Sequence, residues 1–135
     1  MYSGSCGCRE ISFTLAAKPS KLTKCFCSDC RKFSSFFGQL AALHQAADFK
    51  LNDPKGYLKV HVVTTTRSGL PKRRFLCGNC GSSIYTIPRG HEGELVRIRP
   101  TLLDGDFNDY MEGVPVNAIF TEELEKFQVK DVKLI

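Results

Sequence analysis

The arrangement of its seven cysteines constrains this chain more than any other feature. They fall into three short groups, which are Cys6 and Cys8; Cys25, Cys27 and Cys30; and Cys77 and Cys80. Spacings of C-x-C and C-x-x-C let two sulfur atoms from one tight turn reach the same metal ion. An odd number of cysteines also excludes complete pairing into disulfides. We therefore expect metal binding, and zinc is the metal that thiolates favour, although spacing alone does not separate zinc from iron.

The seven cysteines do not divide evenly, because a structural zinc site takes four ligands and one set of four leaves three. Three protein ligands with an open fourth position are typical of a catalytic zinc. Spacing equally allows a zinc ribbon whose four ligands are Cys27, Cys30, Cys77 and Cys80. A histidine is a further candidate ligand, but none of the three lies at a short spacing from a cysteine. We expect surface or strand-packing roles for His44, His61 and His91.

The length and composition predict one compact domain over residues 1–135, because 135 residues at 42% hydrophobic enclose a single core. The start resembles no signal peptide, and no apolar run is long enough to cross a membrane. We expect a soluble cytoplasmic protein without a membrane partner, and a nuclear location stays open. In that reducing setting disulfides are poor candidates. The sequence gives no indication of the oligomeric state.

The net formal charge is +5, but the positive charge is concentrated in the first part of the chain. Residues 1–80 carry 13 Lys and Arg against 4 Asp and Glu, whereas residues 81–135 carry 6 against 10. Basic residues near bound thiolates balance their charge, so we do not expect nucleic-acid binding. The densest basic stretch surrounds a Gly/Pro turn and consists of Arg67, Lys72, Arg73 and Arg74. We interpret it as a solvated hairpin tip, with a surface for an acidic partner as the alternative.

Alternation and β-branched composition predict a mainly β protein. We expect a strand within residues 9–17, a hairpin of residues 56–66 and 72–76, and further strands at 82–87 and 94–103. Residues 33–49 are ambiguous between helix and strand, and their Phe-rich beginning favours strand. Residues 121–127 have a Thr cap candidate followed by acidic residues, which predicts one short helix or turn.

Three segments together resemble a known family. The segment "GSCGCREISF" resembles the opening of its domain, "CFCSDCRKFSSFFG" its C-H-C-x-x-C-R-x-x-x-G block, and "RFLCGNCGSSIY" its F-C-x-x-C-G block. Weaker similarities are "RPTLLDG" and "PVNAIF". The family is that of the glutathione-dependent formaldehyde-activating enzymes, whose GFA domain also occurs in CENP-V. The resemblance covers nearly the whole chain.

The resemblance implies an Mss4-like zinc-binding β fold with two Zn²⁺ ions. It implies a structural zinc held by Cys6, Cys8, Cys77 and Cys80, and a second, open zinc held by Cys25, Cys27 and Cys30. The implied activity is that of a carbon–sulfur lyase like S-(hydroxymethyl)glutathione synthase, which joins formaldehyde to glutathione. Arg31 follows the last ligand of the triad and is a candidate contact for a substrate carboxylate.

The chain departs from the family pattern at three positions. Phe26 replaces the His that usually stands between the first two cysteines of the triad, Ser35 replaces a Gly, and Pro100 replaces the Gly of a G-T-L-D element. The metal ligands survive these changes, whereas substrate specificity depends on residues that have changed. The alternative function is a non-catalytic, zinc-stabilised interaction module.

Overall fold

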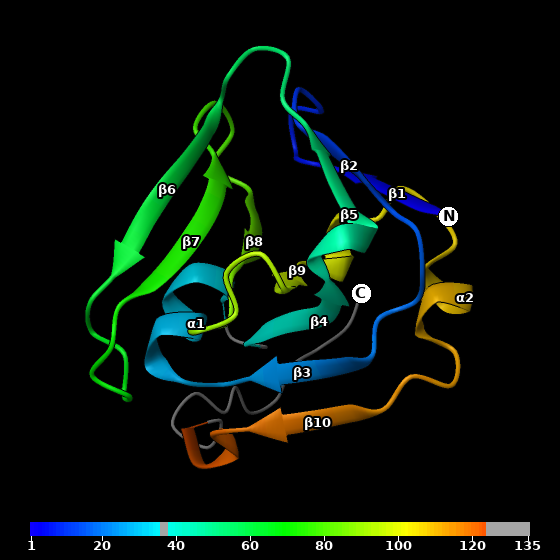
Figure 1. Ribbon diagram of the computed structural model, residues 1–135. Helices are drawn as coiled ribbons and strands as arrows, with labels where there is room; N and C mark the ends of the chain where they lie inside the picture. Colours follow the sequence, from blue (N-terminus) through cyan, green and yellow to red (C-terminus); the bar gives the residue numbers. More distant parts are fainter. Residues whose placement is uncertain (36–37, 124–135) are drawn as a thin grey trace, which may run out of the picture.

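The computed structural model describes residues 1–35 and 38–123, whose strands form two sheets. The smaller sheet is antiparallel, with the order β1-β2-β5. Its strands are β1 (Tyr2–Ser5), β2 (Ser12–Leu15) and β5 (Phe49–Asn52). Figure 1 shows this sheet to one side of the long hairpin of β6 (Leu58–Val63) and β7 (Lys72–Cys77).

The larger sheet has the order β10-β3-β4-β9-β8-β7-β6. Its strands are β3 (Lys21–Cys25), β4 (Gln39–Gln45), β6 (Leu58–Val63), β7 (Lys72–Cys77), β8 (Ser83–Thr86), β9 (Leu95–Ile98) and β10 (Val116–Ile119). All neighbours are antiparallel except β10, which lies parallel to β3 at one edge.

Helical segments are short and connect the strands. They are α1 (Ser28–Ser34), α2 (Phe107–Met111) and the 3-10 turns η1 (Ala46–Asp48) and η2 (Pro100–Leu102). Helix α1 and the loop that joins β8 to β9 both contribute to the wall of one cavity. None of the helices described is long and apolar enough to cross a membrane.

The core joins the two sheets. It includes Ile11, Phe13 and Leu15 from the smaller sheet side and apolar residues of the larger sheet such as Leu22 and Ile98, all at most 2% exposed. Alternating residues of β2 and β9 are buried, which is the pattern of strands with one face on a core. The other face of the larger sheet is therefore left for polar residues.

The structure confirms a mainly β protein and the hairpin predicted around residues 69–71. Strands β6 and β7 pair antiparallel, and Gly69 in their connection has a φ of 75°, a conformation that glycine adopts without a steric cost. Strands also occur within the predicted ranges 9–17, 82–87 and 94–103. The last of these is shorter than expected, because Pro100 begins a 3-10 turn.

The preference for strand at the beginning of residues 33–49 is wrong. Phe33 and Ser34 belong to α1, and the strand begins at Gln39. The local preference of this Phe-rich segment for strand is overridden, because Cys27 caps a helical turn that brings Cys30 back toward Cys25. The helix or turn predicted at 121–127 is a 3-10 turn at residues 121–123, and the remainder lies outside the described residues.

Candidate metal centres

Four cysteine thiols converge where the two sheets meet. Cys6 and Cys8 lie in the turn between β1 and β2, whereas Cys77 ends β7 and Cys80 lies in the turn that leads to β8. Their four sulfur atoms all lie within 4.8 Å of one another. Cys6 and Cys77 are buried, and Cys80 is exposed to solvent. Residues separated by about half the chain thus meet at one point.

The four-thiol group fits a tetrahedral zinc ion. Thiolates at about 2.3 Å from a tetrahedral zinc lie about 3.8 Å from one another. The sulfur atoms of Cys6 and Cys8 are 3.5 Å apart, and those of Cys8 and Cys77 are 3.8 Å apart. The backbone N–H of Ile11 also points at the Cys6 sulfur, at 3.4 Å. This is the donor pattern that holds a thiolate in place.

Ser82 connects the two turns that carry these thiols, a role that its position in the sequence does not reveal. Its hydroxyl accepts a hydrogen bond from the backbone N–H of Gly7 at 2.9 Å and lies 3.3 Å from the Cys80 sulfur. A Cβ on Gly7 would lie 3.2 Å from that hydroxyl, tighter than nine in ten real Cβ contacts, so the hydroxyl would have to move. Glycine at position 7 therefore allows the two turns to approach.

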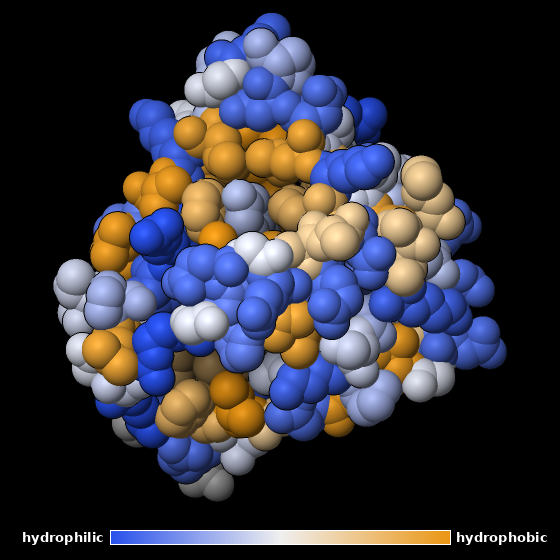
Figure 2. Space-filling view, in the orientation of Figure 1, coloured by the Kyte–Doolittle hydropathy of each residue, from blue (hydrophilic) through white to orange (hydrophobic). Residues whose placement is uncertain are grey.

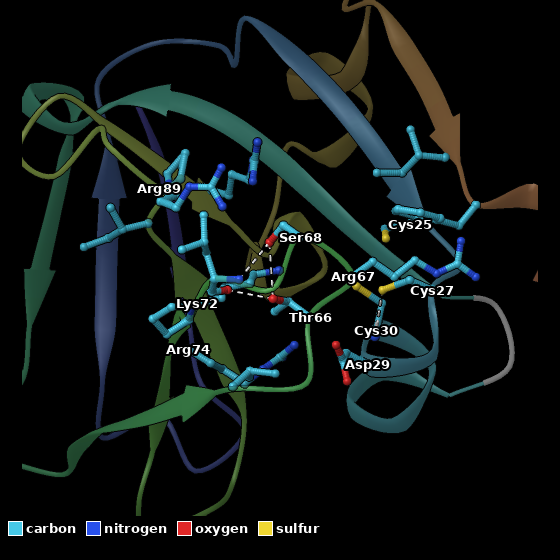
Figure 3. Close-up of a pocket in the computed structure, with 18 of the residues that line it drawn as sticks. Cys25, Cys27, Asp29, Cys30, Thr66, Arg67, Ser68, Lys72, Arg74 and Arg89 are labelled. Carbon is cyan, nitrogen blue, oxygen red and sulfur yellow. Dashed lines mark hydrogen bonds between the residues drawn. The ribbon is translucent and has the colours of Figure 1, made fainter.

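The remaining three thiols form a second group at the end of β3. Cys25 is the last residue of that strand, Cys27 caps α1, and Cys30 lies in the first turn of the helix. Their sulfur atoms lie within 4.8 Å of one another, and the Cys27 sulfur accepts the Cys30 N–H at 3.4 Å. Figure 3 shows the three sulfur atoms together. The structure separates them from Cys77 and Cys80, so the zinc-ribbon division is wrong.

Ser35 follows α1 in a strained conformation. Its φ is 75°, which side chains other than glycine rarely adopt, and its N–H closes the helix by donating to Arg31 O at 2.8 Å. Ser35 is also the position at which the sequence departs from the Gly of the family pattern. Ser35 therefore adopts the positive φ that a Gly at this position would adopt without strain.

The thiols of Cys25 and Cys30 differ in acidity because they share a hydrogen bond. The Cys30 thiol donates to Cys25 and lowers the pKa of Cys25 to about 6, with burial acting in the opposite direction. The same bond and burial raise the pKa of Cys30 far above the usual thiol range. Lys72 favours the thiolate form of both. The Cys25 thiol therefore ionises more readily than the Cys30 thiol, and the thiolate is the form that binds a metal ion.

A cavity of about 440 Å³ adjoins the three thiols. Its wall is formed by α1, by the connection between β6 and β7, by the loop after β8 and by the end of β10. Apolar side chains in this wall are Val63, Leu70, Pro71, Ile87, Pro88, Ile119 and Phe120. Figure 2 shows the hydrophilic surface across the middle of this face, with hydrophobic residues above and below it. A volume of this size admits a small organic ligand.

Positive charge dominates the polar part of the cavity wall. The cationic residues are Arg67, Lys72, Arg74, Arg89 and Arg97, and the only carboxylate among the described wall residues is that of Asp29. Strand register explains two of them: Arg74 lies opposite Thr86, which lies opposite Arg97, so all three share one face of the larger sheet. The cavity is therefore suited to anionic ligands.

Arg74 is nearly inaccessible to solvent, at 1% exposure. Its guanidinium donates to Ser83 Oγ at 3.0 Å and to Gln39 Oε1 at 3.1 Å, and lies 3.6 Å from the centre of the Phe33 ring. Lys72 is half-buried, and burial lowers its pKa. The prediction of a solvated basic tip is therefore wrong for Arg74. A docking surface that uses all four basic residues is excluded for the same reason.

Arg31 lies on α1 and is paired. Its Nη2 is 3.2 Å from Oε2 of Glu123, and Arg67 reaches the other oxygen of the same carboxylate at 2.7 Å. Arg31 is not among the residues that form the cavity wall. Its contact with a substrate carboxylate stays a prediction. The structure adds Lys72 and Arg97 as cations nearer to a ligand in the cavity.

The histidines join neither thiol group within the described residues. His44 is buried on β4, and its Nε2 lies 2.6 Å from the Tyr110 hydroxyl. His61 is exposed on β6. Both observations confirm the packing and surface roles expected. His91 differs, because it lies in the cavity wall with its Nδ1 3.1 Å from Glu94. Its spacing from the cysteines gives no sign of this position.

A mainly β domain with one group of four converging thiols and one of three belongs to the class of proteins whose cysteines are placed to hold metal ions. The family model described as glutathione-dependent formaldehyde-activating enzyme matches residues 1–123, and the chain belongs to this family. No curated protein matches the chain significantly.

Solved structures also resemble the fold. The crystal structure of a Rhodobacter sphaeroides protein from a structural genomics programme has a TM-score of 0.61 with this chain at 20% sequence identity. The match covers 85% of this chain and 99% of that one. At this identity the similarity supports the shared fold and nothing further.

Proposed function

We propose that the chain joins a thiol to a small aldehyde, reversibly, in a carbon–sulfur lyase reaction resembling that of S-(hydroxymethyl)glutathione synthase. The observation that carries the proposal is the group of three thiols beside a cationic cavity, in a chain of this family. Formaldehyde and glutathione are the proposed aldehyde and thiol. The proposal includes a zinc ion at each thiol group, with the four-thiol group as the structural site.

The three-thiol group fits a zinc ion with one open position, because its three sulfur atoms lie within 4.8 Å of one another and face the cavity. Bound zinc would supply the positive charge that favours the thiolate form of a nearby thiol. Lys72 and Arg97 would attract the carboxylates of glutathione, and the apolar wall would exclude water from the reacting sulfur. These groups would together bind the substrate, favour its thiolate form and keep water away from its sulfur.

The chemical step needs one proton. The thiolate sulfur attacks the carbonyl carbon, the carbon–sulfur bond forms, and the π electron pair moves to the oxygen, which takes a proton to become a hydroxyl. His91 is the proposed donor, because it lies in the cavity wall and Glu94 holds its Nδ1. Its Nε2 then exchanges the proton with the substrate oxygen, and in the reverse reaction it takes the proton back.

Cys27→Ser tests the proposal most directly. We expect this variant to fold and to lose one equivalent of metal, because the four-thiol group is untouched. Exchange between formaldehyde and S-hydroxymethylglutathione, followed by NMR exchange spectroscopy, should be accelerated by wild type and return to the uncatalysed rate with Cys27→Ser. Metal content by mass spectrometry and the melting temperature complete the comparison.

A second measurement separates binding from catalysis. In cobalt-substituted protein, glutathione should change the visible absorption, whereas oxidised glutathione, which has no free thiol, should change it less. A spectral change without accelerated exchange would mean that the site binds thiols and acts on another carbonyl compound. If neither effect occurs, the catalytic proposal is wrong and the non-catalytic interaction module takes its place.

A further inference from the structure

One apolar row crosses all the strands of the larger sheet. The strand registers place its members opposite one another, from one edge to the other: Val116, Leu22, Ala42, Ile98, Tyr85, Phe75 and Val60. Opposite residues share one face of a sheet. Leu22, Ala42 and Ile98 in the middle of the row are fully buried, whereas Val60 and Val116 at its ends are 51% and 60% exposed. The apolar face that forms the core therefore continues beyond its cover at both edges of the sheet.

At the β6 edge this uncovered surface contains a second valine. Val62 is 48% exposed and follows Val60 by two residues, so both side chains lie on the same face of the strand. Phe75 on β7 and Tyr85 on β8 continue the surface, with parallel rings whose centroids are 4.3 Å apart. Both aromatic residues are only partly buried. An apolar surface thus extends from the outermost strand to the core.

The backbone of β6 is also open at this edge. Among the described strands β6 pairs with β7 alone, and Figure 1 shows no strand on its outer side. Leu58 donates its N–H to Asp53 Oδ2 at 2.9 Å, away from β7. Because the backbone groups of an antiparallel strand alternate in direction, those of Val60 and Val62 point outward as well. They can donate to and accept from one further strand.

The charged residues around this edge are basic. Between Asp53 and Glu92 the sequence contains Lys and Arg but no acidic residue. Lys59 on β6 and Arg73 on β7 are exposed, and neither forms an ion pair with any other residue that the structure describes. A second copy of the chain would bring like charges together at this edge, whereas an acidic partner would bring opposite charge.

We propose that the β6 edge binds an acidic protein segment in extended conformation, which adds a strand to the larger sheet. Apolar side chains of the segment lie on the face of Val60 and Val62, and its alternate, acidic side chains lie on the face of Lys59. Main-chain hydrogen bonds supply affinity in this mode of binding, and alternate side chains supply specificity. None of these three residues belongs to the wall of the cavity beside the three thiols, so the surface is independent of the proposed reaction.

Fluorescence anisotropy with labelled, end-blocked peptides tests the proposal. The probe is EVEVEVE, and its controls are KVKVKVK, of opposite charge, and EEVVEVE, of the same composition without strict alternation. We expect the probe to bind with a dissociation constant of about 0.1 mM or lower, and each control to bind at least about tenfold more weakly. Methylation of every second backbone nitrogen should abolish binding for one of the two alternating sets only. Binding that survives both methylations, or no binding of the probe, would overturn the proposal.

Two substitutions assign the site to β6. Val60→Glu should abolish binding of EVEVEVE, and Val116→Glu is the matched control at the other exposed end of the apolar row. Lys59→Glu should weaken EVEVEVE and strengthen KVKVKVK, each by about 3- to 10-fold, and keeps the proposal testable if Val60→Glu does not fold. Equal affinity of wild type and Val60→Glu for EVEVEVE would contradict the site, as would an unchanged preference in Lys59→Glu.

Sedimentation velocity distinguishes the other occupant, a second copy of the chain. A wild-type dimer that Val60→Glu converts to a monomer would show that the edge pairs with itself, and the acidic partner would then be wrong. Binding of EVEVEVE should persist in Cys27→Ser, because the β6 edge is remote from that thiol in the sheet order. Failure of the proposed lyase activity and failure of the β6 surface are thereby distinguished.

Discussion

At the scale of single residues, buried polar groups carry specific consequences for stability. His44 is 2% exposed, and the Tyr110 hydroxyl is its hydrogen-bond partner. Burial lowers the pKa of His44 to about 4, although Asp48 acts in the opposite direction. The ring is therefore neutral in the folded protein over most of the accessible pH range. Tyr110 is in turn fully buried, and burial raises its pKa.

The burial of His44 should make the folded protein less stable in mild acid. Above a pH of about 6.5 the ring is neutral in both folded and unfolded states and adds no pH dependence. Between about 6.5 and 4 the unfolded chain takes up a proton that the folded protein refuses, so the free energy of unfolding should fall by about 2 to 3 kcal/mol. Urea unfolding of wild type and His44→Gln at several pH values measures this. An equally steep loss in both proteins would refute the assignment to His44.

Replacement of His91 should impair catalysis and leave glutathione binding intact. Replacement by Gln should lower the NMR exchange rate by roughly a hundredfold or more, the usual contribution of a positioned proton donor. Glutathione should still change the spectrum of the cobalt protein, because the thiols and cations are unchanged. His61→Gln is the control, since His61 lies outside the cavity wall. Equal rates in the two variants would remove His91 from the reaction.

At the scale of the elements, β7 and α1 depend on each other. Arg74 extends from β7 beneath α1, where its guanidinium lies 3.6 Å from the Phe33 ring centre, and it also donates to Gln39 on β4. These contacts join two strands to the helix that carries Cys30. The position of the three-thiol group is therefore fixed by a side chain distant in the sequence.

Arg74→Leu should destabilise the protein by roughly 2 to 4 kcal/mol, because a cation–π contact is lost and the buried Gln39 Oε1 keeps only the longer hydrogen bond from Ser34 Oγ, at 3.5 Å. Metal affinity at the three-thiol group should fall as α1 loosens, while the four-thiol group keeps its metal. Arg73→Leu changes the preceding residue, which is exposed, and its free energy of unfolding should stay within about 0.5 kcal/mol of wild type. Chemical unfolding and metal titration measure both quantities. A similar effect of the two substitutions would contradict this coupling.

The sequence was sufficient for some elements and insufficient for others, for identifiable reasons. The hairpin around Gly69 follows from β-branched runs and a Gly/Pro turn, which are local signals. The sequence did not predict helix α1, because its Phe-rich end favours strand locally. The contact that favours helix is the capping of the first turn by Cys27. Lys72 and Arg97 reach the cavity through strand order and register, which local patterns do not encode. Cysteine spacing likewise left the division of the thiols open, and family resemblance indicated the one observed.

At the scale of the whole molecule, the four-thiol group fastens one sheet to the other. Cys6 and Cys8 belong to a turn of the smaller sheet, and Cys77 and Cys80 to a turn of the larger one. The core between the sheets lies beside this junction, because Cys6, Cys8 and Cys77 belong to the same cluster as Ile11 and Phe13. A metal ion here would connect two sheets that the chain joins through loops and through the 3-10 turn η1.

Cys80→Ser should therefore unfold the protein or lower its melting temperature severely. Structural zinc supplies about 10 to 16 kcal/mol of apparent binding free energy, comparable with the whole stability of a domain. Hydrogen exchange should accelerate first in β1, β2 and β5. Cys27→Ser is the matched control, since it removes a thiol from the other group. A soluble Cys80→Ser protein with an unchanged melting temperature would show that the junction does not depend on metal.

The two thiol groups also differ in when they come into existence. Cys25, Cys27 and Cys30 belong to one short stretch, so their side chains are present together early during synthesis on the ribosome. The other group stays incomplete until Cys77 and Cys80 have been made, and Cys80 follows Cys30 by 50 residues. A metal ion that reaches the growing polypeptide therefore meets the triad first. The order of translation itself would favour metal binding at the three-thiol group before the group that joins the sheets.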